Sequence, residues 1–276
     1  MAPEHIARLK NPVAELIADA CARFVLPRFQ ALKQDQIQTK SSPNDLVTIA
    51  DIEAEAWLAP QLCQLIPGSV ALGEEAASRG EIDSQIMAGE APIWVIDPVD
   101  GTYNFAHGNS EFCCMAALII GRQVLAGWIY FPTEQCLFWA GRGLGAVKCQ
   151  NGQEAQPLNI STPPDLGALS HRFFNRPDLK GRKSDILSSL SPTQPTRCAG
   201  MDYRRTAEGT YGFVAMASLT PWDHAPGTLL VTEAGGQAWL NGGPYDPKVD
   251  QGILITGANL PRMQQIQTAL SAPHES

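Results

Sequence analysis

The segment that most constrains the fold is an apolar run followed at once by two carboxylates. Residues 93–96 are all apolar, as in a buried β-strand, and the next six residues, 97–102, read DPVDGT. Asp97 and Asp100 therefore stand three residues apart on a predicted tight turn at the end of a buried strand. Mg²⁺ prefers several oxygen ligands in octahedral geometry and often shares them with a substrate phosphate. The segment therefore favours a magnesium site that handles phosphate.

The overall charge of the chain excludes two classes of partner. The chain has 276 residues and a formal net charge of −8. Nucleic acids and anionic membranes are bound mainly through Lys and Arg, so we expect neither as a partner. An acidic protein that handles phosphate needs another source of positive charge, and a bound metal ion would supply it.

The cysteines and the apolar segments indicate the compartment. The seven cysteines form no CxxC pair and most have apolar neighbours, which is typical of reduced, buried thiols in a cytoplasmic protein. No run of about 18 apolar residues occurs, and the first ten residues do not resemble a signal peptide, so we expect no membrane span.

Helical and strand patterns alternate along the whole chain. Apolar residues recur at helical spacing over 4–33 and 49–65, and further helices are predicted at 178–190, within 202–217, and at 223–234 and 261–270. Predicted strands include 70–72, 111–120, 123–131, 135–139, 168–174 and 252–257. This mixture predicts a layered α/β architecture. The polar segment 150–164 suits a connection between an N-terminal half, 1–150, and a C-terminal half, 151–276.

Three acidic clusters share one local character, because each lies beside Gly or Pro where a strand ends or a helix begins. Taken singly, each has an ordinary explanation as a turn, a solvated surface or a helix N-cap. Taken together they would repel one another without a cation, so their convergence would require metal. The clusters are Gly73-Glu74-Glu75, the turn with Asp97 and Asp100, and Trp222-Asp223, and a fourth group upstream contains Lys40, Asp45 and Asp51.

With these motifs the chain resembles the inositol monophosphatase family of Mg²⁺-dependent, lithium-sensitive phosphatases. Residues 97–105 match the first signature of that family, and residues 222–227, WDHAPG, match the second. The resemblance extends from about residue 10 to about residue 265. It implies a layered αβαβα sandwich of the sugar-phosphatase type, which inositol monophosphatases share with fructose bisphosphatases, and it makes a homodimer plausible.

The resemblance also implies a role for each acidic residue. Glu74, Asp97 and the carbonyl of Val99 would bind a first Mg²⁺, and Asp97, Asp100 and Asp223 a second, while a weaker third ion would use Glu74 and water. Thr102, oriented by Asp51, would help to deprotonate the attacking water together with the metal. The N–H groups of Gly101 and Thr102 would hold the phosphate, and Asp100 would lie near the leaving oxygen. Three further residues would support the metal ligands without binding the metal themselves: Lys40, Asp45 and Glu75.

The substrate pocket departs from the family pattern at one position. Members that bind inositol carry a Glu seven residues before the second-signature Asp, and this chain has Met216 there. A hydrogen bond to a ring hydroxyl is lost, so histidinol phosphate, a sugar bisphosphate and adenosine 3′,5′-bisphosphate stay open as substrates beside inositol phosphate. Residues 199–212, with Asp202, either line the substrate pocket or form a surface helix. A protein that binds divalent metal without catalysis is the alternative from another class.

Two further motifs have a structural explanation. Residues 141–146, GRGLGA, fit a dinucleotide-binding pattern, but the turn signal at 151–152 leaves no room for the helix that such a site requires, so a hairpin is predicted. His224 follows a metal-ligand candidate, but on a helix its side chain would point about 100° away from Asp223, which disfavours a role as catalytic base.

Overall fold

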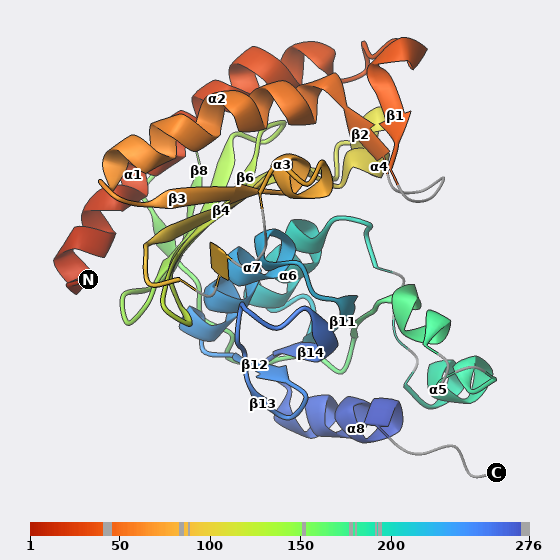
Figure 1. Cartoon of the computed structure of the whole chain (residues 1–276). Helices are drawn as coiled ribbons and strands as arrows, with labels where there is room; N and C mark the ends of the chain where they lie inside the picture. The colour runs from red at the N-terminus through yellow and green to blue at the C-terminus, as the bar shows by residue number, and fades with distance from the viewer. Residues whose placement is uncertain are drawn as a thin grey trace.

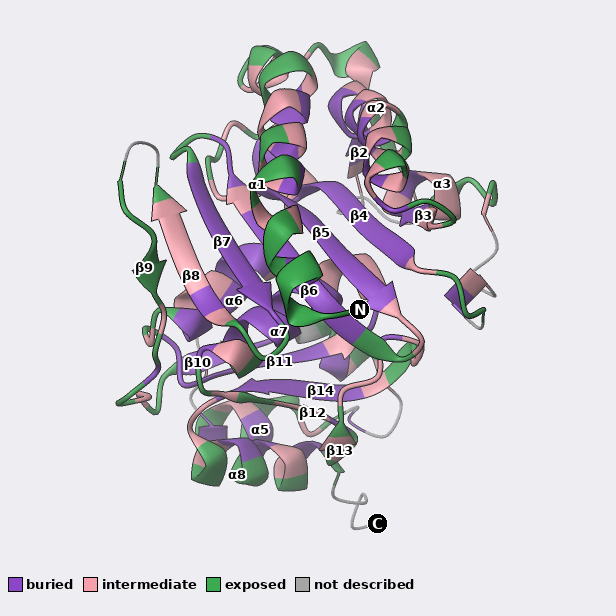
Figure 2. Cartoon of the chain, turned by 90° about the vertical axis from the view of Figure 1, so that its left-hand side faces the viewer, coloured by how far each residue is buried: buried purple, intermediate pink, exposed green. Residues whose placement is uncertain are grey.

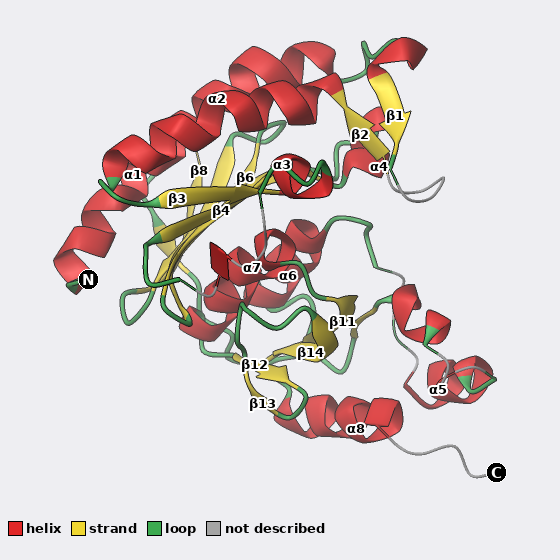
Figure 3. Cartoon of the chain, in the orientation of Figure 1, coloured by secondary structure: helices red, strands yellow, loops and turns green. Residues whose placement is uncertain are grey.

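The computed structural model describes residues 1–40, 46–82, 86–87, 89–150, 153–176, 179, 181–190, 192 and 195–271, and His171 by its backbone alone. Asp45 lies outside the described residues. Strands and helices form five layers that alternate from the top to the bottom of the molecule (Figure 1), and Figure 3 separates the two kinds of element by colour.

The outermost helical layer consists of two long helices. α1 (Pro3–Ala20) continues through a π-helical turn at Cys21–Val25 and a 3₁₀ turn at Leu26–Arg28, and α2 (Ile49–Leu65) lies beside it (Figure 1). Thr48 caps α2 because its hydroxyl accepts a hydrogen bond from the N–H of Ala50 at 3.2 Å. A short hairpin, β1 (Ile37–Thr39) and β2 (Leu46–Thr48), leads into α2.

The second layer is a seven-stranded sheet in the order β3-β4-β5-β6-β7-β8-β9. β3 and β4 are parallel and all the other neighbours are antiparallel. Figure 2 shows that its central strands are buried along most of their length. The strands are β3 (Val70–Gly73), β4 (Ile93–Asp100), β5 (Cys113–Ile120), β6 (Gln123–Phe131), β7 (Cys136–Gly141), β8 (Gly145–Gln150) and β9 (Gln156–Pro157).

The lower three layers come from the second part of the chain. α6 (Ala199–Ala207) and α7 (Pro221–Glu233) lie between the two large sheets (Figure 1). The second sheet has the order β10-β11-β14-β12-β13, and α5 (Lys183–Leu190) and α8 (Leu260–Ser271) cover its outer face. Its strands are β10 (Gly167–Leu169), β11 (Phe213–Ser218), β12 (Gln237–Leu240), β13 (Gly243–Pro244) and β14 (Gln251–Gly257).

The alternation of side chains along β5 explains how one sheet supports two cores. Met115 and Ala117 belong to the core that contains α6 and α7, whereas Ala116 and Leu118 belong to the core under α1 and α2. Successive residues of a strand point to opposite faces, so a strand buried on both faces is apolar throughout. The layered αβαβα fold predicted from the sequence is confirmed.

Two predicted elements differ from the observed ones in kind, and the helices predicted at 4–33 and 178–190 differ in their bounds. The strand predicted at 168–174 ends at Leu169, and His171–Asn175 form a 3₁₀ helix whose start is capped by Ser170, since its hydroxyl accepts from the N–H of Arg172 at 3.3 Å. The predicted tight turn at residues 97–100 is instead the end of β4, where the register with β5 shifts between Asp97 and Asp100. Such a bulge re-aims side chains at the end of a strand.

Candidate metal centre

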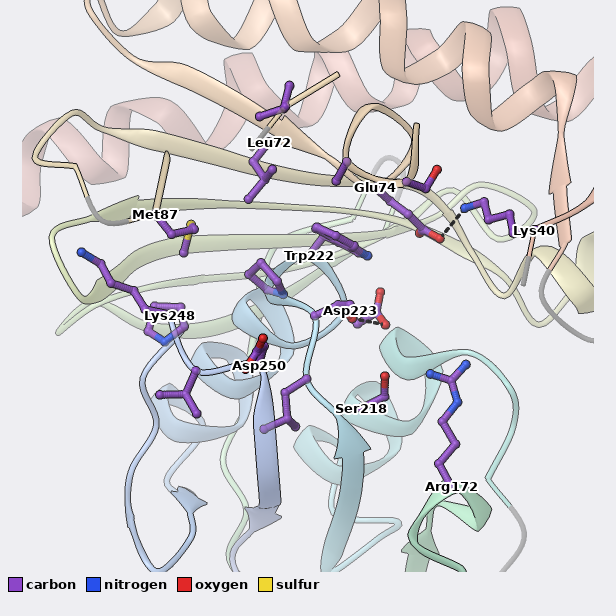
Figure 4. A pocket seen from close by; sticks show the side chains of 18 of the residues that line it. Lys40, Leu72, Glu74, Met87, Arg172, Ser218, Trp222, Asp223, Lys248 and Asp250 are labelled. Carbon is purple, nitrogen blue, oxygen red and sulfur yellow. Dashed lines mark hydrogen bonds and ion pairs between the residues drawn. The ribbon is translucent and has the colours of Figure 1, made fainter. Parts of the chain in front are cut away.

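Three carboxylates from distant parts of the chain meet at one point. Glu74, Asp97 and Asp223 each have a carboxylate oxygen, and these three oxygens all lie within 4.8 Å of one another. Glu74 opens α3 (Glu74–Ser78) directly after β3, Asp97 lies near the end of β4, and Asp223 lies in the first turn of α7. Figure 4 shows Glu74 and Asp223 reaching into the same space from opposite sides. The fold thus brings together three of the predicted ligand side chains.

The position of Glu74 depends on Glu55, which the sequence analysis did not identify. The carboxylate of Glu55 accepts hydrogen bonds from the N–H of Glu75 at 2.7 Å and of Ala76 at 2.8 Å, so it caps the short helix α3. A Cβ atom at Gly73 would lie 2.2 Å from the carboxyl carbon of Glu55. Gly73 is therefore required if Glu55 is to reach these amides.

Lys40 bridges two neighbouring acids beside the cluster. Its Nζ donates to Oε1 of Glu74 and to Oε1 of Glu75, both at 2.8 Å (Figure 4 draws the first). Burial alone would lower the pKa of Lys40, but the two carboxylates outweigh it and hold that pKa above its ordinary value. Burial also raises the pKa of Glu75. Lys40 thus stays charged and restrains Glu74.

Asp100 lies beside the group of three and points toward the start of α6. Its Oδ1 accepts from the N–H of Ala199 at 3.0 Å, and its Oδ2 accepts from the N–H of Gly200 at 2.6 Å. The thiols of Cys198 and Cys113 lie 3.1 and 3.5 Å from the same Oδ2. A negative charge at the N-terminus of a helix is stabilised by the unpaired amides there. Asp100 therefore docks the end of β4 on α6.

Thr102 and Asp51 are in contact across the end of β4. The hydroxyl of Thr102 lies 3.1 Å from Oδ1 of Asp51 and 2.9 Å from the carbonyl oxygen of Val99, and it can donate its proton to one of them. The other oxygen of Asp51 accepts from the N–H and the hydroxyl of Thr48. Burial raises the pKa of Asp51 to about 7. The pair predicted to act on water is thus assembled.

Gly101 fits its place for two reasons. It is the N-cap residue of α4 (Thr102–Ala106) and has a φ of +88°, a conformation that favours glycine. A Cβ atom there would lie 3.0 Å from the carbonyl oxygen of Glu111 and 3.1 Å from Cβ of Cys198. The position therefore has no room for a side chain, and the backbone at the start of α4 stays open to the cavity.

His224 is held as a neutral side chain. Its Nε2 lies 2.5 Å from the carbonyl oxygen of Ser218, so Nε2 carries the proton and donates it. Its Nδ1 then accepts from the hydroxyl of Tyr203 at 3.0 Å. Burial lowers the pKa of His224 to about 4. Both ring nitrogens have partners, so the ring orients the start of α7.

The electrostatics of the cluster fit a divalent cation. Burial raises the pKa of Asp97 well above its ordinary value, and the charges of Glu74, Asp100 and Asp223 add to the effect. Burial likewise raises the pKa of Asp223 to about 8, although the hydroxyl of Thr220 donates to its Oδ2 at 2.6 Å. Buried carboxylates in contact must take up protons or a cation. An all-oxygen donor set of this kind suits Mg²⁺.

Two adjoining cavities open over these residues. One, of about 380 Å³, is lined by predicted site residues from 74 to 223, and the other is larger, about 1080 Å³. The two share Glu74, Arg172, Ser218 and Asp223, and Figure 4 shows the larger one with Arg172 pointing into it. Met216 lines the smaller cavity.

Asp202 and two arginines also line the smaller cavity. Asp202 is buried and its Oδ1 accepts from the N–H of Thr196 at 3.2 Å, and burial raises its pKa to about 7. Arg172 and Arg197 were not identified from the sequence, because no local pattern marks an arginine that the fold turns into a cavity. The segment 199–212 thus reaches this cavity through Asp202, and its role in a substrate pocket stays a prediction.

The chain is similar to known proteins along nearly its whole length. A model of the inositol monophosphatase family matches residues 9–271. Inositol-1-monophosphatase of Bacillus subtilis is 30% identical over 233 residues, which cover 83% of this chain and 84% of that protein. Fructose-1,6-bisphosphatase/inositol-1-monophosphatase of Aquifex aeolicus is 25% identical over 241 residues, covering 84% and 86%.

The fold has a close counterpart among solved structures. An IMPase/NADP phosphatase solved with Mg²⁺ and phosphate superposes with a TM-score of 0.77 at 19% identity, over 99% of this chain and 98% of that one. Among the described residues, no helix combines the length and the apolar character that a membrane crossing needs.

Proposed function

Because the chain belongs to the inositol monophosphatase family and is a metal-dependent phosphomonoesterase, we propose that it hydrolyses a small phosphorylated metabolite at the carboxylate cluster. The meeting of Glu74, Asp97 and Asp223 within 4.8 Å carries this proposal. The raised pKa values of Asp97 and Asp223 mean that these two carboxyl groups carry protons without metal and exchange them for a cation. A structural neighbour that was solved with Mg²⁺ and phosphate supports magnesium as that cation.

Two to three Mg²⁺ ions would be held by the predicted ligands. Glu74, Asp97 and the Val99 carbonyl would hold the first, Asp97, Asp100 and Asp223 the second, and Glu74 with water a third. For this role, the carboxylate of Asp100 would have to bind the ion while it keeps its hydrogen bonds to α6. When bound, Mg²⁺ lowers the pKa of the attacking water and neutralises the charge of the phosphate.

Thr102 and Asp51 would position the attacking water. The hydroxyl of Thr102 can accept a hydrogen bond from that water while it donates to Asp51 at 3.1 Å. Asp51 is fixed in turn by the amide and hydroxyl of Thr48. With a pKa near 7, Asp51 can take up a proton close to neutral pH.

The start of α4 would hold the phosphate. The N–H groups of Gly101 and Thr102 belong to the first turn of a helix, where amides have no partner within the helix. The leaving oxygen would lie near Asp100, and Asp202 would face the remainder of the substrate from α6. Phosphoryl transfer needs little more than such placement and charge neutralisation.

The identity of the substrate depends on the cavity wall. The thioether of Met216 is a weak acceptor and does not replace the carboxylate with which the family's Glu binds a ring hydroxyl, so inositol phosphate is one candidate among several. A relative named for both fructose-1,6-bisphosphatase and inositol monophosphatase activity supports a sugar bisphosphate, and histidinol phosphate and adenosine 3′,5′-bisphosphate complete the set.

Three further properties belong to the proposal: the first two follow from the family resemblance, and the third follows from the cysteines. They are inhibition by lithium, a homodimer, and a cytoplasmic location. All seven cysteines are free thiols, including Cys113 and Cys198, whose sulfur atoms are 3.7 Å apart. Free thiols at this spacing favour a reducing compartment.

The test measures phosphate release from a panel of phosphomonoesters with Mg²⁺ and with EDTA. We expect turnover with Mg²⁺ only, and we expect Asp97→Asn to abolish it while circular dichroism shows an intact fold. Retained activity in Asp97→Asn would contradict the site. Tight metal binding without turnover of any panel member would favour the alternative, a metal-binding protein without catalysis.

A further inference from the structure

We propose that Arg172 and Arg197 form a second anion site in the smaller cavity, so that the preferred substrate carries a second phosphate group. This inference rests on the proposed function, because it concerns the substrate of the same site. Both arginines line the cavity of about 380 Å³ that also contains Asp97, Asp100 and Thr102. Among the described residues that line this cavity, Arg172 and Arg197 are the two with a cationic side chain.

Both guanidinium groups keep their N–H donors free of partners within the described part of the chain. Within the described part of the chain, no hydrogen bond and no ion pair involves the side chain of Arg172 or Arg197. Other arginines on the same molecule are paired: Arg204 contacts Glu134 at 2.6 Å and Arg205 contacts Glu111 at 2.7 Å. An arginine with five free donors in a cavity matches the oxygens of a phosphate.

Arg197 is held in an unusual conformation. Its φ is +65°, a left-handed conformation that is unfavourable for any residue with a Cβ atom and that glycine adopts freely. A residue kept in such a conformation at the wall of a cavity is a reasonable candidate for function. Glycine would suit this backbone better than arginine. The reason for an arginine at this position therefore lies in its side chain.

The neighbours of Arg197 fix its backbone from both sides. The N–H of Thr196 donates to Asp202 at 3.2 Å, and the carbonyl oxygen of Thr196 accepts from the side-chain amide of Asn104 at 2.9 Å. The hydroxyl of Thr196 donates to the carbonyl oxygen of Cys198 at 2.8 Å. Asp202 thus acts as a positioning residue for the segment that carries Arg197.

The side chain of Arg197 is also ordered before any ligand binds. Its guanidinium lies over the ring of Tyr103 at 4.2 Å, and that ring stacks on His107 at 4.1 Å. A cation above an aromatic face keeps its N–H edge free for an anion. Preorganised donors bind a phosphate without a further loss of side-chain entropy.

Arg172 lines the same cavity from a different segment of the chain. It lies in the 3₁₀ helix after β10, lines both cavities, and points toward Ser218 and Asp223 in Figure 4. Its charge lowers the pKa of Asp223, although burial raises that pKa more. A phosphate beside Arg172 would be joined to the reacting phosphate by the body of the substrate.

The experiment compares kcat/KM, with Mg²⁺, for substrate pairs that differ by one phosphate. The pairs are fructose 1,6-bisphosphate with fructose 1-phosphate, and adenosine 3′,5′-bisphosphate with adenosine 3′-phosphate. We expect the wild-type protein to prefer the bisphosphate of at least one pair by about tenfold or more, as a charge-assisted hydrogen-bond pair provides.

The variants separate the anion site from general effects. Arg197→Gly removes the guanidinium and relieves the left-handed backbone, so it should fold, and we expect the preference to fall about tenfold through a higher KM for the bisphosphate. Arg197→Lys should restore part of the preference, and Arg172→Ala should lower it. Arg23→Ala is the matched control, because Arg23 is exposed, pairs with Asp19 and lies on the outer helical layer.

The outcomes are distinct from those that test the proposed function. Mg²⁺-dependent hydrolysis of the monophosphates with no preference in either pair would leave that function in place and overturn the anion site. An equal loss of kcat/KM on both members of a pair in Arg197→Gly would also overturn it, because it would show a general electrostatic effect.

Discussion

The N–H of Gly200 donates a 2.6 Å hydrogen bond to Oδ2 of Asp100, 100 positions earlier in the chain. This contact joins the end of β4 to the start of α6. A Cβ atom at Gly200 would lie 2.4 Å from the sulfur of Cys113 and 3.0 Å from the sulfur of Met115. The two layers can therefore meet at Asp100 only because residue 200 has no side chain.

We expect Gly200→Ala to destabilise the protein, because overpacking of a filled core costs about 1–3 kcal/mol. Urea unfolding followed by circular dichroism measures the change. Gly243→Ala is the control, since its Cβ atom would have its nearest neighbour at 3.6 Å. An equal midpoint for Gly200→Ala and Gly243→Ala would show that α6 can move aside at no cost.

Gly73 and Glu55 should behave as a coupled pair. Gly73→Ala alone places a Cβ atom against the Glu55 carboxylate and displaces the cap of α3, so we expect lower stability and lower Mg²⁺-dependent activity. In a Glu55→Ala background the collision is absent. The added destabilisation by Gly73→Ala should then shrink by about 1 kcal/mol or more, which a double-mutant cycle measures. Strictly additive effects would contradict the assigned contact.

Asp97→Asn should stabilise the metal-free protein while it abolishes turnover. Burial and four neighbouring carboxylates raise the pKa of Asp97, so folding without metal requires this carboxyl group to take up a proton, and a neutral amide of the same shape avoids that free-energy cost. Oδ1 of the amide can still accept from the N–H of Val99. The measurement is the melting temperature in EDTA and in excess Mg²⁺. We expect a higher value than wild type in EDTA and a smaller rise with Mg²⁺; a lower value in EDTA would count against electrostatic strain at the site.

Asp202 should make stability depend on pH in a defined direction. Burial raises its pKa to about 7, from an ordinary 3.8, so the folded state binds the proton more tightly. Its contribution is fully present below pH 3.8 and is lost as the pH rises toward 7, by at most about 4 kcal/mol. Asp202→Asn does not titrate. Its stability relative to wild type should therefore increase between pH 5 and pH 8 in urea titrations with EDTA, and a constant difference would contradict the buried carboxyl.

The sequence predicts the regular elements well and the short ones poorly. Helix α2 has its predicted bounds, 49–65, because Thr48 provides a cap and Pro67-Gly68 a stop. The five-residue helices α3 and α4 are too short to show a helical period, so they were not predicted. The acidic clusters were found because carboxylates beside glycine and proline leave a local pattern.

The remaining site residues depend on tertiary contacts that no local pattern records. Glu55 reads as an ordinary helical glutamate until β3 places Gly73 against it. Arg172 and Arg197 gain their significance only from the cavity that they share. The direction of Asp100 likewise follows from where α6 begins, 99 positions later.

The distance along the chain between Glu74, Asp97 and Asp223 has a kinetic consequence. The three oxygens come together only after α7 has docked between the two sheets, so partly folded chains offer no complete set of ligands. A cation that binds only the native state lengthens the lifetime of that state and leaves the search for it almost unchanged. Magnesium should therefore slow the unfolding of this protein far more than it accelerates refolding.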